Sequence, residues 1–480
     1  MIVRSLTRVA VRSPLLRTMA RAAIPRPLRR GLHAYLDFDA TADHSPQAYQ
    51  KLLAHAEPID NRTSGCIVMV CGSLAPGGAE RQLVNTLRGL AVKGYRDRLL
   101  LLSHHRLVPG QSEQYDFYLP TLKQIGVQAR EITQKEREWF SFTFGLPKRM
   151  NPALRHLPTH LMADVADLYR EFIALRPSVV HAWLDWSNVR AGLAAVLAGV
   201  PRIILSGRNL NPTQFFFNTP YFRPVYLALT DRPNVVLVNN SEAGAADYAN
   251  WLGLSRERIS VIRNGIDFSD SARPSAQSIT DFRHKLGICP TAPLVGGIFR
   301  FSPEKRPNLW IETAALVAGK RPDCRFVLIG QGPLRKEMAE LAGARGLNSR
   351  LTIRGVTDSP LIALASFDVC LLASAAEGTP NIALESQCVG TPVVATDGGG
   401  TCEAVEIGST GWIVHRPDPV EIANTVLQLI ADDTRRAAVA ERGPAFVRSR
   451  YGLQRMIGET LKIYQLGGGS EASGWSSVSR

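Results

Sequence analysis

The sequence predicts an α/β protein built from two Rossmann-like, doubly wound domains that face each other across a cleft. The first observation is length, because 480 residues are roughly two to three times an ordinary single domain. The second is a recurring pattern, in which a short apolar run is followed by a glycine-rich or polar turn and an amphipathic segment of helical length. Such alternation is typical of parallel sheets, which bind ligands at the carboxyl ends of their strands.

Composition excludes several classes of protein. Hydrophobic residues make up 45% of the chain and charged residues 20%, which excludes a mainly disordered or collagen-like protein. Apolar runs such as 99–102 and 235–238 are far shorter than the roughly 18 to 20 residues of a membrane-spanning helix. The seven cysteines are scattered and contain no C-x-x-C pair, which favours a reducing cytosol and no cysteine-based metal site.

The charge balance indicates an anionic partner. The chain has 56 Lys and Arg against 42 Asp and Glu, a net charge of +14. Nucleotide phosphates, acidic lipid and nucleic acid would all suit such a protein. Nucleic acid is the least favoured of these partners, because basic and aromatic residues do not interleave in a known binding module.

The two ends of the chain differ from the rest, and we expect residues 1–64 to form a basic extension. Residues 1–36 contain eight arginines and no acidic residue. Interleaved apolar residues favour an amphipathic helix on an anionic membrane surface, although Pro14 and Pro25 would interrupt it. An Arg-rich organelle transit peptide and a loosely packed extension are the alternatives. The Gly/Ser-rich tail 467–480 is expected to be disordered.

The strand candidates divide into two sets. We expect those of the first domain, residues 65–250, at 66–71, 98–102, 179–182, 202–205 and 235–239. We expect those of the second domain, residues 258–450, at 259–262, 294–299, 325–329, 351–354, 369–372, 392–395 and 411–414. Segment 115–160 alternates less cleanly, so we interpret it as an insertion in the first domain.

A glycine-rich turn follows the first expected strand. Gly77 and Gly78 lie just before a helix expected at about 79–92. Their spacing matches neither a G-x-G-x-x-G nor a Walker A motif, but glycines at a strand-to-helix turn let backbone N–H groups approach an anion. A plain tight turn is the alternative interpretation.

Two cations follow the expected strand 294–299. Arg300 stands just past its carboxyl end and Lys305 five residues further on, with Arg306 as an alternative second cation. Two permanent charges at a ligand-binding edge suit a diphosphate. The alternative is a solvated basic loop.

The expected strand 369–372 leads into a third motif. Pro380 suits a helix start, so the free N–H groups of Asn381 and Ile382 could face a phosphate. Glu377 lies in the loop and Glu385 eight residues on, in the helix. Ionised carboxylates only accept hydrogen bonds, so this pair suits the hydroxyls of a sugar and a ribose.

Together these segments resemble the retaining nucleotide-sugar glycosyltransferases of family four, the glycogen-synthase-like group with the GT-B fold. The resemblance covers about residues 65–465, and its most specific element is the Glu-x7-Glu stretch. The segments that carry it are 77–81, 261–267, 330–333 and 377–385, with Arg300 and Lys305. It implies an N-terminal acceptor domain, a C-terminal donor domain, no metal, retention of anomeric configuration, and a last helix, 453–465, that crosses back to the first domain.

The resemblance also implies roles for single residues in binding the donor. The backbone at Gly77, Gly78 and Gly378, and at Asn381 and Ile382, would approach the donor.

The side chains of the site would divide the remaining roles. Arg300 and Lys305 would hold the charge of the diphosphate. Glu377 would contact the sugar or its reacting face, and Glu385 would accept from the ribose hydroxyls.

Two further positions follow from the resemblance. The backbone around Val356 would face the nucleobase. His181 resembles the histidine that meets the hydroxymethyl group of the sugar, although Trp183 stands where many relatives have a second histidine. A structurally satisfied histidine is the alternative.

The resulting prediction is a cytoplasmic enzyme, peripheral at the cytosolic membrane face. It would move a hexosyl group from a nucleotide sugar, expected to be UDP-linked, to a glycan or lipid-linked acceptor in polysaccharide or glycoconjugate biosynthesis. We expect no cofactor besides the nucleotide-sugar co-substrate. A nucleotide-sugar epimerase of the same fold and a non-catalytic, nucleotide-binding membrane scaffold are the alternatives.

Overall fold

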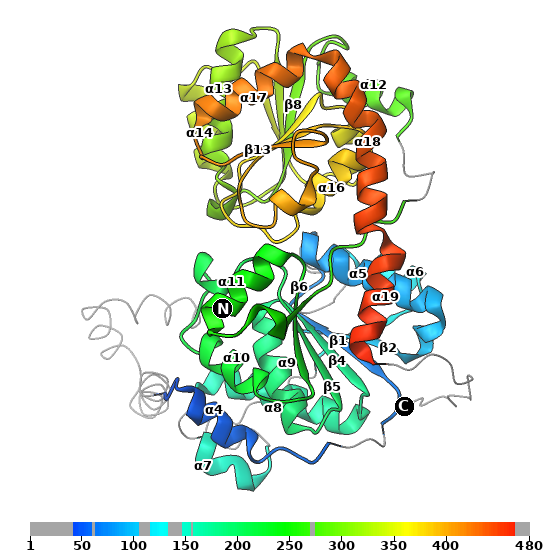
Figure 1. The fold of residues 1–480 in the computed structure, drawn as a ribbon, viewed down its shortest axis with the longest axis vertical. Coiled ribbons are helices and arrows are strands. Elements are labelled where there is room, and N and C mark those ends of the chain that lie inside the picture. Colours follow the sequence, from blue (N-terminus) through cyan, green and yellow to red (C-terminus); the bar gives the residue numbers. More distant parts are fainter. Residues whose placement is uncertain are drawn as a thin grey trace, which may run out of the picture.

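The computed structural model describes residues 42–59, 63–104, 116–132, 146–154, 157–268 and 274–465. They form two α/β domains stacked along the long axis of the molecule, with α18 (Asp433–Tyr451) and α19 (Leu453–Tyr464) running along one side of both (Figure 1). Each domain has one parallel sheet, so the predicted fold class is confirmed.

The first domain holds a seven-stranded sheet in the order β3-β2-β1-β4-β5-β6-β7. All its neighbouring strands are parallel. The strands are β1 (Ile67–Cys71), β2 (Leu99–Ser103), β3 (Gln128–Glu131), β4 (Val179–Trp183), β5 (Arg202–Ser206), β6 (Val235–Asn239) and β7 (Ile259–Val261). The strand order reverses between β1 and β4, and such a switch point opens a crevice at the carboxyl ends of the strands.

The second domain holds a six-stranded sheet in the order β10-β9-β8-β11-β12-β13, again with parallel neighbours. The strands are β8 (Leu294–Ile298), β9 (Arg325–Ile329), β10 (Leu351–Arg354), β11 (Val369–Leu372), β12 (Val393–Thr396) and β13 (Gly411–Val414). Its switch point lies between β8 and β11. The loops after these two strands contain the predicted cations and Glu377, and Glu385 follows in α16.

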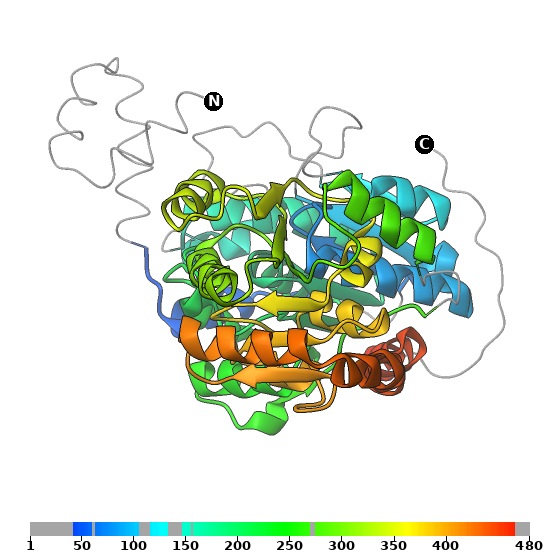
Figure 2. The ribbon, with the colours of Figure 1, turned by 90° about the horizontal axis from the view of Figure 1, so that it is seen from above.

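Helices cover both faces of each sheet, which is why central strands such as β1 and β4 are buried along their whole length (Figures 1 and 2). In the first domain these are α4 (Pro46–Leu53), α5 (Gly78–Leu90), α6 (Leu119–Gln124), α7 (Asn151–Leu154), α8 (Thr159–Leu175), α9 (Asp185–Leu197), α10 (Phe222–Thr230) and α11 (Glu242–Leu252). In the second they are α12 (Ala276–Lys285), α13 (Pro307–Lys320), α14 (Arg335–Ala344), α15 (Pro360–Ala365), α16 (Asn381–Cys388) and α17 (Pro419–Ala431). Among the described helices, none combines the length and apolar character needed to cross a bilayer.

The structure corrects three expectations about these elements. Strand β7 was expected in the second domain, but it pairs with β6, because α11 returns the chain to the edge of the first sheet. Strand β3 was not expected, since its sequence Gln-Ala-Arg-Glu has no apolar run, yet it forms the opposite edge. Part of the expected extension 1–64 is core, because Tyr49, Leu52 and Leu53 of α4 are buried in the first domain. Residues 1–36 and the tail 467–480 lie outside the described residues.

The chain crosses between the domains twice, and the two crossings are hydrogen-bonded to each other. The Ile266 N–H donates to the carbonyl of Tyr451 at 2.7 Å, and the Leu453 N–H donates to the carbonyl of Ile266 at 3.0 Å. Helix α19 then packs on α5, as expected for a last helix that returns to the first domain. At this contact a Cβ on Gly89 would lie 2.3 Å from Cγ1 of Ile457, so the two helices approach closely only because residue 89 is glycine.

Candidate active site

The carboxyl edges of the two sheets meet near their switch points, where α5 of the first domain faces α16 of the second. The Asn381 side chain donates from Nδ2 to the carbonyl of Gly78 at 2.9 Å. A Cβ on Gly78 would lie 3.1 Å from the same Nδ2 atom. The predicted glycine turn and the predicted helix start are therefore in direct contact. Asn381 and Ile382 are the first residues of α16, so their N–H groups have no intrahelical acceptor.

The side chain of Asn381 joins a buried polar network between the domains. Its Oδ1 accepts from Nε2 of Gln82 at 3.0 Å and from Nδ2 of Asn264 at 2.7 Å. Asn264 Nδ2 also donates to the carbonyl of Thr379 at 2.9 Å. Gln82 Oε1 in turn accepts from the N–H of Gly265 at 2.8 Å. This network fixes the loop before α16 against the first domain.

The second carboxylate of the Glu-x7-Glu stretch is paired across the same interface. Glu385 of α16 forms an ion pair with Arg81 of α5, and its other oxygen, Oε2, has no hydrogen-bond partner among the described residues. Burial raises the pKa of Glu385, while Arg81 opposes that rise. An unsatisfied, buried carboxylate oxygen is costly, so Glu385 is equipped to accept from a ligand hydroxyl.

The first carboxylate is paired within its own domain. Glu377 forms an ion pair with Lys305, which ends the short 3-10 turn Pro303–Lys305. The N–H of Glu377 donates to the carbonyl of Gly398 at 2.7 Å, which ties this loop to the glycine-rich turn after β12. Lys305 and Glu377 therefore lie together at the carboxyl edge of the second sheet.

Arg300 follows β8 and is exposed. Its charge lowers the pKa of Glu80 in α5, although burial raises that pKa more. Arg300 thus acts electrostatically on the first domain from the edge of the second sheet. The structure brings both predicted cations and both predicted carboxylates to the facing edges.

Two other positions that were predicted to contact the sugar-nucleotide donor differ in exposure. Val356 follows β10, the strand at one edge of the second sheet, and is 47% exposed. Gly378 is packed tightly, because a Cβ there would lie 2.2 Å from Oδ1 of Asn240 and 2.7 Å from the carbonyl oxygen of Arg208. A side chain at residue 378 would push the loop away from the first domain.

His181 lies within β4 and not at its end, because the strand continues to Trp183. Its Nδ1 is hydrogen-bonded to the hydroxyl of Tyr464 in α19 at 2.8 Å. Burial, together with the smaller effect of the charge of Arg208, lowers the pKa of His181 to about 3. The imidazole is therefore neutral at physiological pH, which excludes it as a cationic partner of a phosphate.

Several contacts of this site cannot be predicted from the local sequence. Gln82 and Asn240 are ordinary polar residues, and only their contacts with segments more than a hundred residues away reveal them. Asn264 lies in segment 261–267, which carries part of the family resemblance, but its contact with Asn381 was not predicted. Arg208 could have been found, because it follows β5 just as Arg300 follows β8. Glu403, which follows the glycine-rich turn after β12, accepts from the N–H groups of Glu242 and Ala243 at 3.0 and 2.8 Å, at the start of α11.

The arrangement offers anion binding and hydroxyl binding but no cluster of metal ligands. Among the described residues, no group of three or more His, Cys, Asp or Glu side chains could hold a metal ion. Arg300, Lys305 and the start of α16 can neutralise phosphate charge. Glu377 and Glu385 can accept from hydroxyls. Such a set is chemically suited to a sugar attached to a nucleoside diphosphate.

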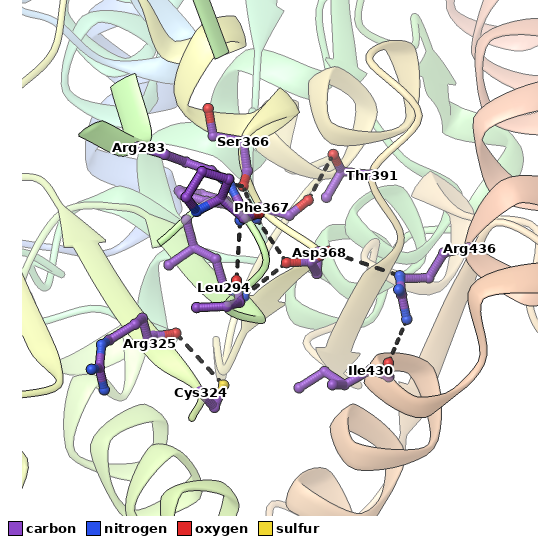
Figure 3. Close-up of polar contacts among 12 residues, drawn as sticks. Arg283, Leu294, Cys324, Arg325, Ser366, Phe367, Asp368, Thr391, Ile430 and Arg436 are labelled. Carbon is purple, nitrogen blue, oxygen red and sulfur yellow. Dashed lines mark hydrogen bonds and ion pairs between the residues drawn. The ribbon is translucent and has the colours of Figure 1, made fainter. Parts of the chain in front are cut away.

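A cavity of about 340 Å³ lies elsewhere in the second domain, near the loop before β11. Figure 3 shows Arg283 and Arg436 converging there on Asp368. Arg283 also donates to the carbonyl of Ser366 through Nε and Nη2, at 3.0 and 2.8 Å. These arginines are occupied by backbone and carboxylate acceptors, so the cluster stabilises the domain.

Comparison with known proteins identifies both halves of the chain. Residues 76–270 match the model of "Glycosyltransferase Family 4", and residues 278–446 match that of "Glycosyl transferases group 1". The Vi polysaccharide biosynthesis protein VipC/TviE of Salmonella typhi is 29% identical over 419 residues, which cover 83% of this chain and 71% of that protein. The lipopolysaccharide core biosynthesis glycosyltransferase LpsE of Rhizobium meliloti is 33% identical over 200 residues, 42% of this chain and 55% of that one.

Solved structures share the fold. The Anabaena protein Alr3699/HepE, crystallised in complex with UDP and glucose, superimposes with a TM-score of 0.69 at 22% identity, over 83% of this chain and 99% of its own. The lipopolysaccharide glycosyltransferase WaaG superimposes with a TM-score of 0.61 at 15% identity, over 84% of this chain and all of its own. At these identities the similarity establishes the arrangement of two facing domains.

Proposed function

Because the chain belongs to the family-four glycosyltransferases with the GT-B fold, we propose that it transfers a hexosyl group from UDP-sugar to a growing surface glycan with retention of configuration. The observation that carries this proposal is that both Glu-x7-Glu carboxylates pair with a cation, Glu377 with Lys305 within the second domain and Glu385 with Arg81 across the domain interface. Cations and hydroxyl acceptors therefore lie within one site. UDP is the favoured nucleotide because the Anabaena protein was solved with UDP and UDP-glucose.

In the proposed reaction the leaving diphosphate carries most of the developing charge. Arg300, Lys305 and the free N–H groups at the start of α16 stabilise that charge, which lets the anomeric bond weaken toward an oxocarbenium ion. The acceptor attacks from the same face, and the leaving phosphate takes its proton. Glu377 contacts the sugar and Glu385 the ribose hydroxyls. His181, neutral by burial, donates or accepts a hydrogen bond without adding charge.

The proposed reaction needs no metal, because side chains and a helix start neutralise the diphosphate. The Asp37-Phe38-Asp39 stretch, an Asp-x-Asp sequence, lies outside the described residues. Transfer is expected to continue in excess EDTA. Loss of activity with chelator and recovery with Mg²⁺ or Mn²⁺ would contradict this part of the proposal.

The acceptor is proposed to be a glycan or lipid-linked glycan at the cytosolic membrane face. The names of the Salmonella and Rhizobium relatives, in polysaccharide and lipopolysaccharide biosynthesis, support a surface glycan. The eight arginines within residues 1–36 support an anionic membrane surface, since each contributes about 1 kcal/mol near such a surface. Co-sedimentation of the full chain and of a variant lacking residues 1–36, with anionic and neutral vesicles at low and high salt, tests this point. Equal binding of both proteins would exclude the membrane role.

A two-step assay tests the proposed function. A thermal-shift screen with UDP, GDP, ADP and their sugars identifies the nucleotide, because a ligand that binds the folded state raises Tm. The stabilising donor is then incubated with and without acceptor, and the anomeric proton of the product is followed by NMR. Transfer with retention supports the proposal. An altered sugar released without acceptor would indicate an epimerase, and binding without turnover would indicate a scaffold.

A further inference from the structure

Arg208 is a buried arginine at the carboxyl edge of the first sheet. It follows β5, and its guanidinium carbon lies 4.5 Å from the ring centroid of Trp183 in the neighbouring strand β4. Its side chain donates from Nη2 to Oδ1 of Asn264 at 2.8 Å and from Nη1 to Oγ of Ser206 at 3.5 Å. Only 9% of the residue is exposed. The guanidinium is therefore a fixed cation with a neutral environment.

No carboxylate balances this charge within the described part of the chain. Arg208 has no ion pair there, and its Nε atom has no hydrogen-bond acceptor. Burial lowers the pKa of Arg208 to about 9, which reflects the cost of an unbalanced charge. Buried charges in proteins are normally paired, so a cation without a counter-ion calls for an anion from outside the chain.

Arg190, in the same domain, is a Trp-stacked arginine with a structural role and serves as a comparison for Arg208. The guanidinium carbon of Arg190 lies 4.4 Å from the ring centroid of Trp186, almost the same stacking distance as for Arg208. Unlike Arg208, Arg190 donates from Nε to Oδ2 of Asp164 at 2.7 Å. The missing carboxylate therefore distinguishes Arg208 from an otherwise similar arginine.

Two other unpartnered groups lie beside Arg208. His181 and Trp183 point to the same face of β4, with ring centroids 4.9 Å apart. Both residues are 2% exposed, and among the described residues neither Nε2 of His181 nor Nε1 of Trp183 has a hydrogen-bond partner. Arg208, Trp183 and His181 together form a buried cluster with hydrogen-bonding capacity that the chain itself does not use.

This cluster adjoins the loop that carries Glu377. The carbonyl carbon of Arg208 would lie 3.0 Å from a Cβ on Gly378. Asn264, which holds the guanidinium, also donates to the carbonyl of Thr379 in the same loop at 2.9 Å. The cluster therefore lies in the first domain at the position where the loop after β11 approaches it.

We propose that Arg208, with Trp183 and His181, binds the anionic group, a carboxylate or a phosphate, of a sugar held between the domains. This inference rests on the proposed sugar-transfer function and adds to it a preference for an anionic sugar. The diphosphate is the less suitable occupant, because Arg300 and Lys305 already provide cations for it from the second domain. The anionic sugar is either the one carried by the donor or the one that ends the acceptor, and binding measurements separate the two.

Isothermal titration with matched neutral and anionic sugars tests the proposal. The donor experiment compares UDP, UDP-glucose and UDP-glucuronate. The acceptor experiment adds glucose, glucuronate or glucose 6-phosphate to protein saturated with UDP. Each titration uses the native protein, Arg208→Met, and Arg190→Met as the control that removes the other Trp-stacked arginine. Melting curves check that the variants are folded.

We expect the native protein to bind the anionic sugar at least about tenfold more tightly than the neutral one in one of the two experiments, because one charge-assisted hydrogen bond provides about that gain in affinity. Arg208→Met should lose that preference and keep its affinity for UDP, while Arg190→Met keeps both. Equal affinity of the native protein for neutral and anionic sugars in both experiments would overturn the inference, whether or not Arg208→Met folds. Loss of UDP affinity in Arg208→Met, with no sugar preference in the native protein, would assign Arg208 to the diphosphate and also overturn it. Failure of the native protein to bind UDP would instead contradict the UDP-sugar donor of the proposed function.

Discussion

Arg81 and Glu385 form an ion pair that joins α5 of the first domain to α16 of the second. The side chain of Glu385 is 7% exposed and that of Arg81 is 32% exposed, so the pair lies at the inner edge of the interface. The pair has two consequences. It holds the domains together, and it opposes the rise in pKa that burial imposes on the carboxylate at the position proposed for the ribose.

Breaking this pair from either side should destabilise the protein. Arg81→Met leaves a buried carboxylate without its cation, and Glu385→Gln leaves Arg81 without its acceptor. Each variant should lose about 2 kcal/mol of unfolding free energy, less than for a fully buried pair because water reaches Arg81. The double variant should recover part of that loss. Denaturant unfolding of all four proteins gives the coupling energy. Arg345→Met, which breaks the more exposed pair with Glu312, is the control and should cost at most about 1 kcal/mol. Strict additivity of the two single changes would contradict the pairing.

The pH dependence of stability should also reveal the effect of Arg81 on the pKa of Glu385. Burial raises its pKa above the ordinary value of 4.5, and Arg81 lowers it, so removal of Arg81 raises the pKa further. A carboxyl group with a raised pKa in the folded state binds protons more tightly when folded, so its contribution to stability falls as pH rises from the unfolded pKa to the folded one. The destabilisation by Arg81→Met should therefore be small near pH 4 and increase toward pH 8. Urea unfolding at several pH values measures it. In a Glu385→Gln background the effect of Arg81→Met should not change with pH, and a similar slope in both backgrounds would contradict the assignment.

Comparison of predicted and observed strands and helices shows which features of the fold the local sequence determines. Buried parallel strands such as β1 and β8 were predictable because each is a short apolar run followed by a glycine-rich or basic turn. Strand β7 was assigned to the wrong sheet because strand pairing depends on where α11 returns the chain, which no local pattern encodes. Helix α4 was missed as core because a basic segment precedes it.

The candidate site shows the same division. The positions of Arg300, Lys305 and Glu377 could be predicted because each residue follows a strand at the carboxyl edge of the sheet. The partners of Glu385 and Asn381 could not, because the contacts of Arg81 and Gln82 with them span about three hundred residues. Such contacts depend on how the two domains meet, which is set by the packing of α19 and by the hydrogen-bonded crossings at Ile266.

Removing either predicted cation should reduce turnover and leave the fold intact. Arg300→Ala and Lys305→Ala should each lower the rate of transfer by on the order of 10², since charge-assisted donors to a developing anion supply several kcal/mol of barrier reduction. Lys305→Ala also leaves Glu377 without its ion-pair partner, so it should affect sugar contact as well. Steady-state kinetics with the donor that stabilises the protein measures both effects. Lys336→Ala, an exposed lysine on α14, is the control and should be neutral. Near-native transfer by both folded variants would exclude the assigned diphosphate site.

Alanine at two glycines, one on α5 and one on α19, should change the stability of the protein in opposite directions. A Cβ on Gly89 would lie 2.3 Å from Cγ1 of Ile457, so Gly89→Ala forces α19 away from α5 and should cost about 1 to 3 kcal/mol. Gly458 lies within α19 itself and has open space around its Cα, so Gly458→Ala should stabilise the protein by up to about 1 kcal/mol through helix propensity alone. Thermal unfolding of the two variants measures the expected loss and the expected gain of stability. Adding Ile457→Ala to Gly89→Ala should relieve the clash, because it removes the Cγ1 atom that the new methyl group meets. If Gly89→Ala is as stable as the native protein, or if Ile457→Ala gives no relief, α19 does not rest on α5 at this contact.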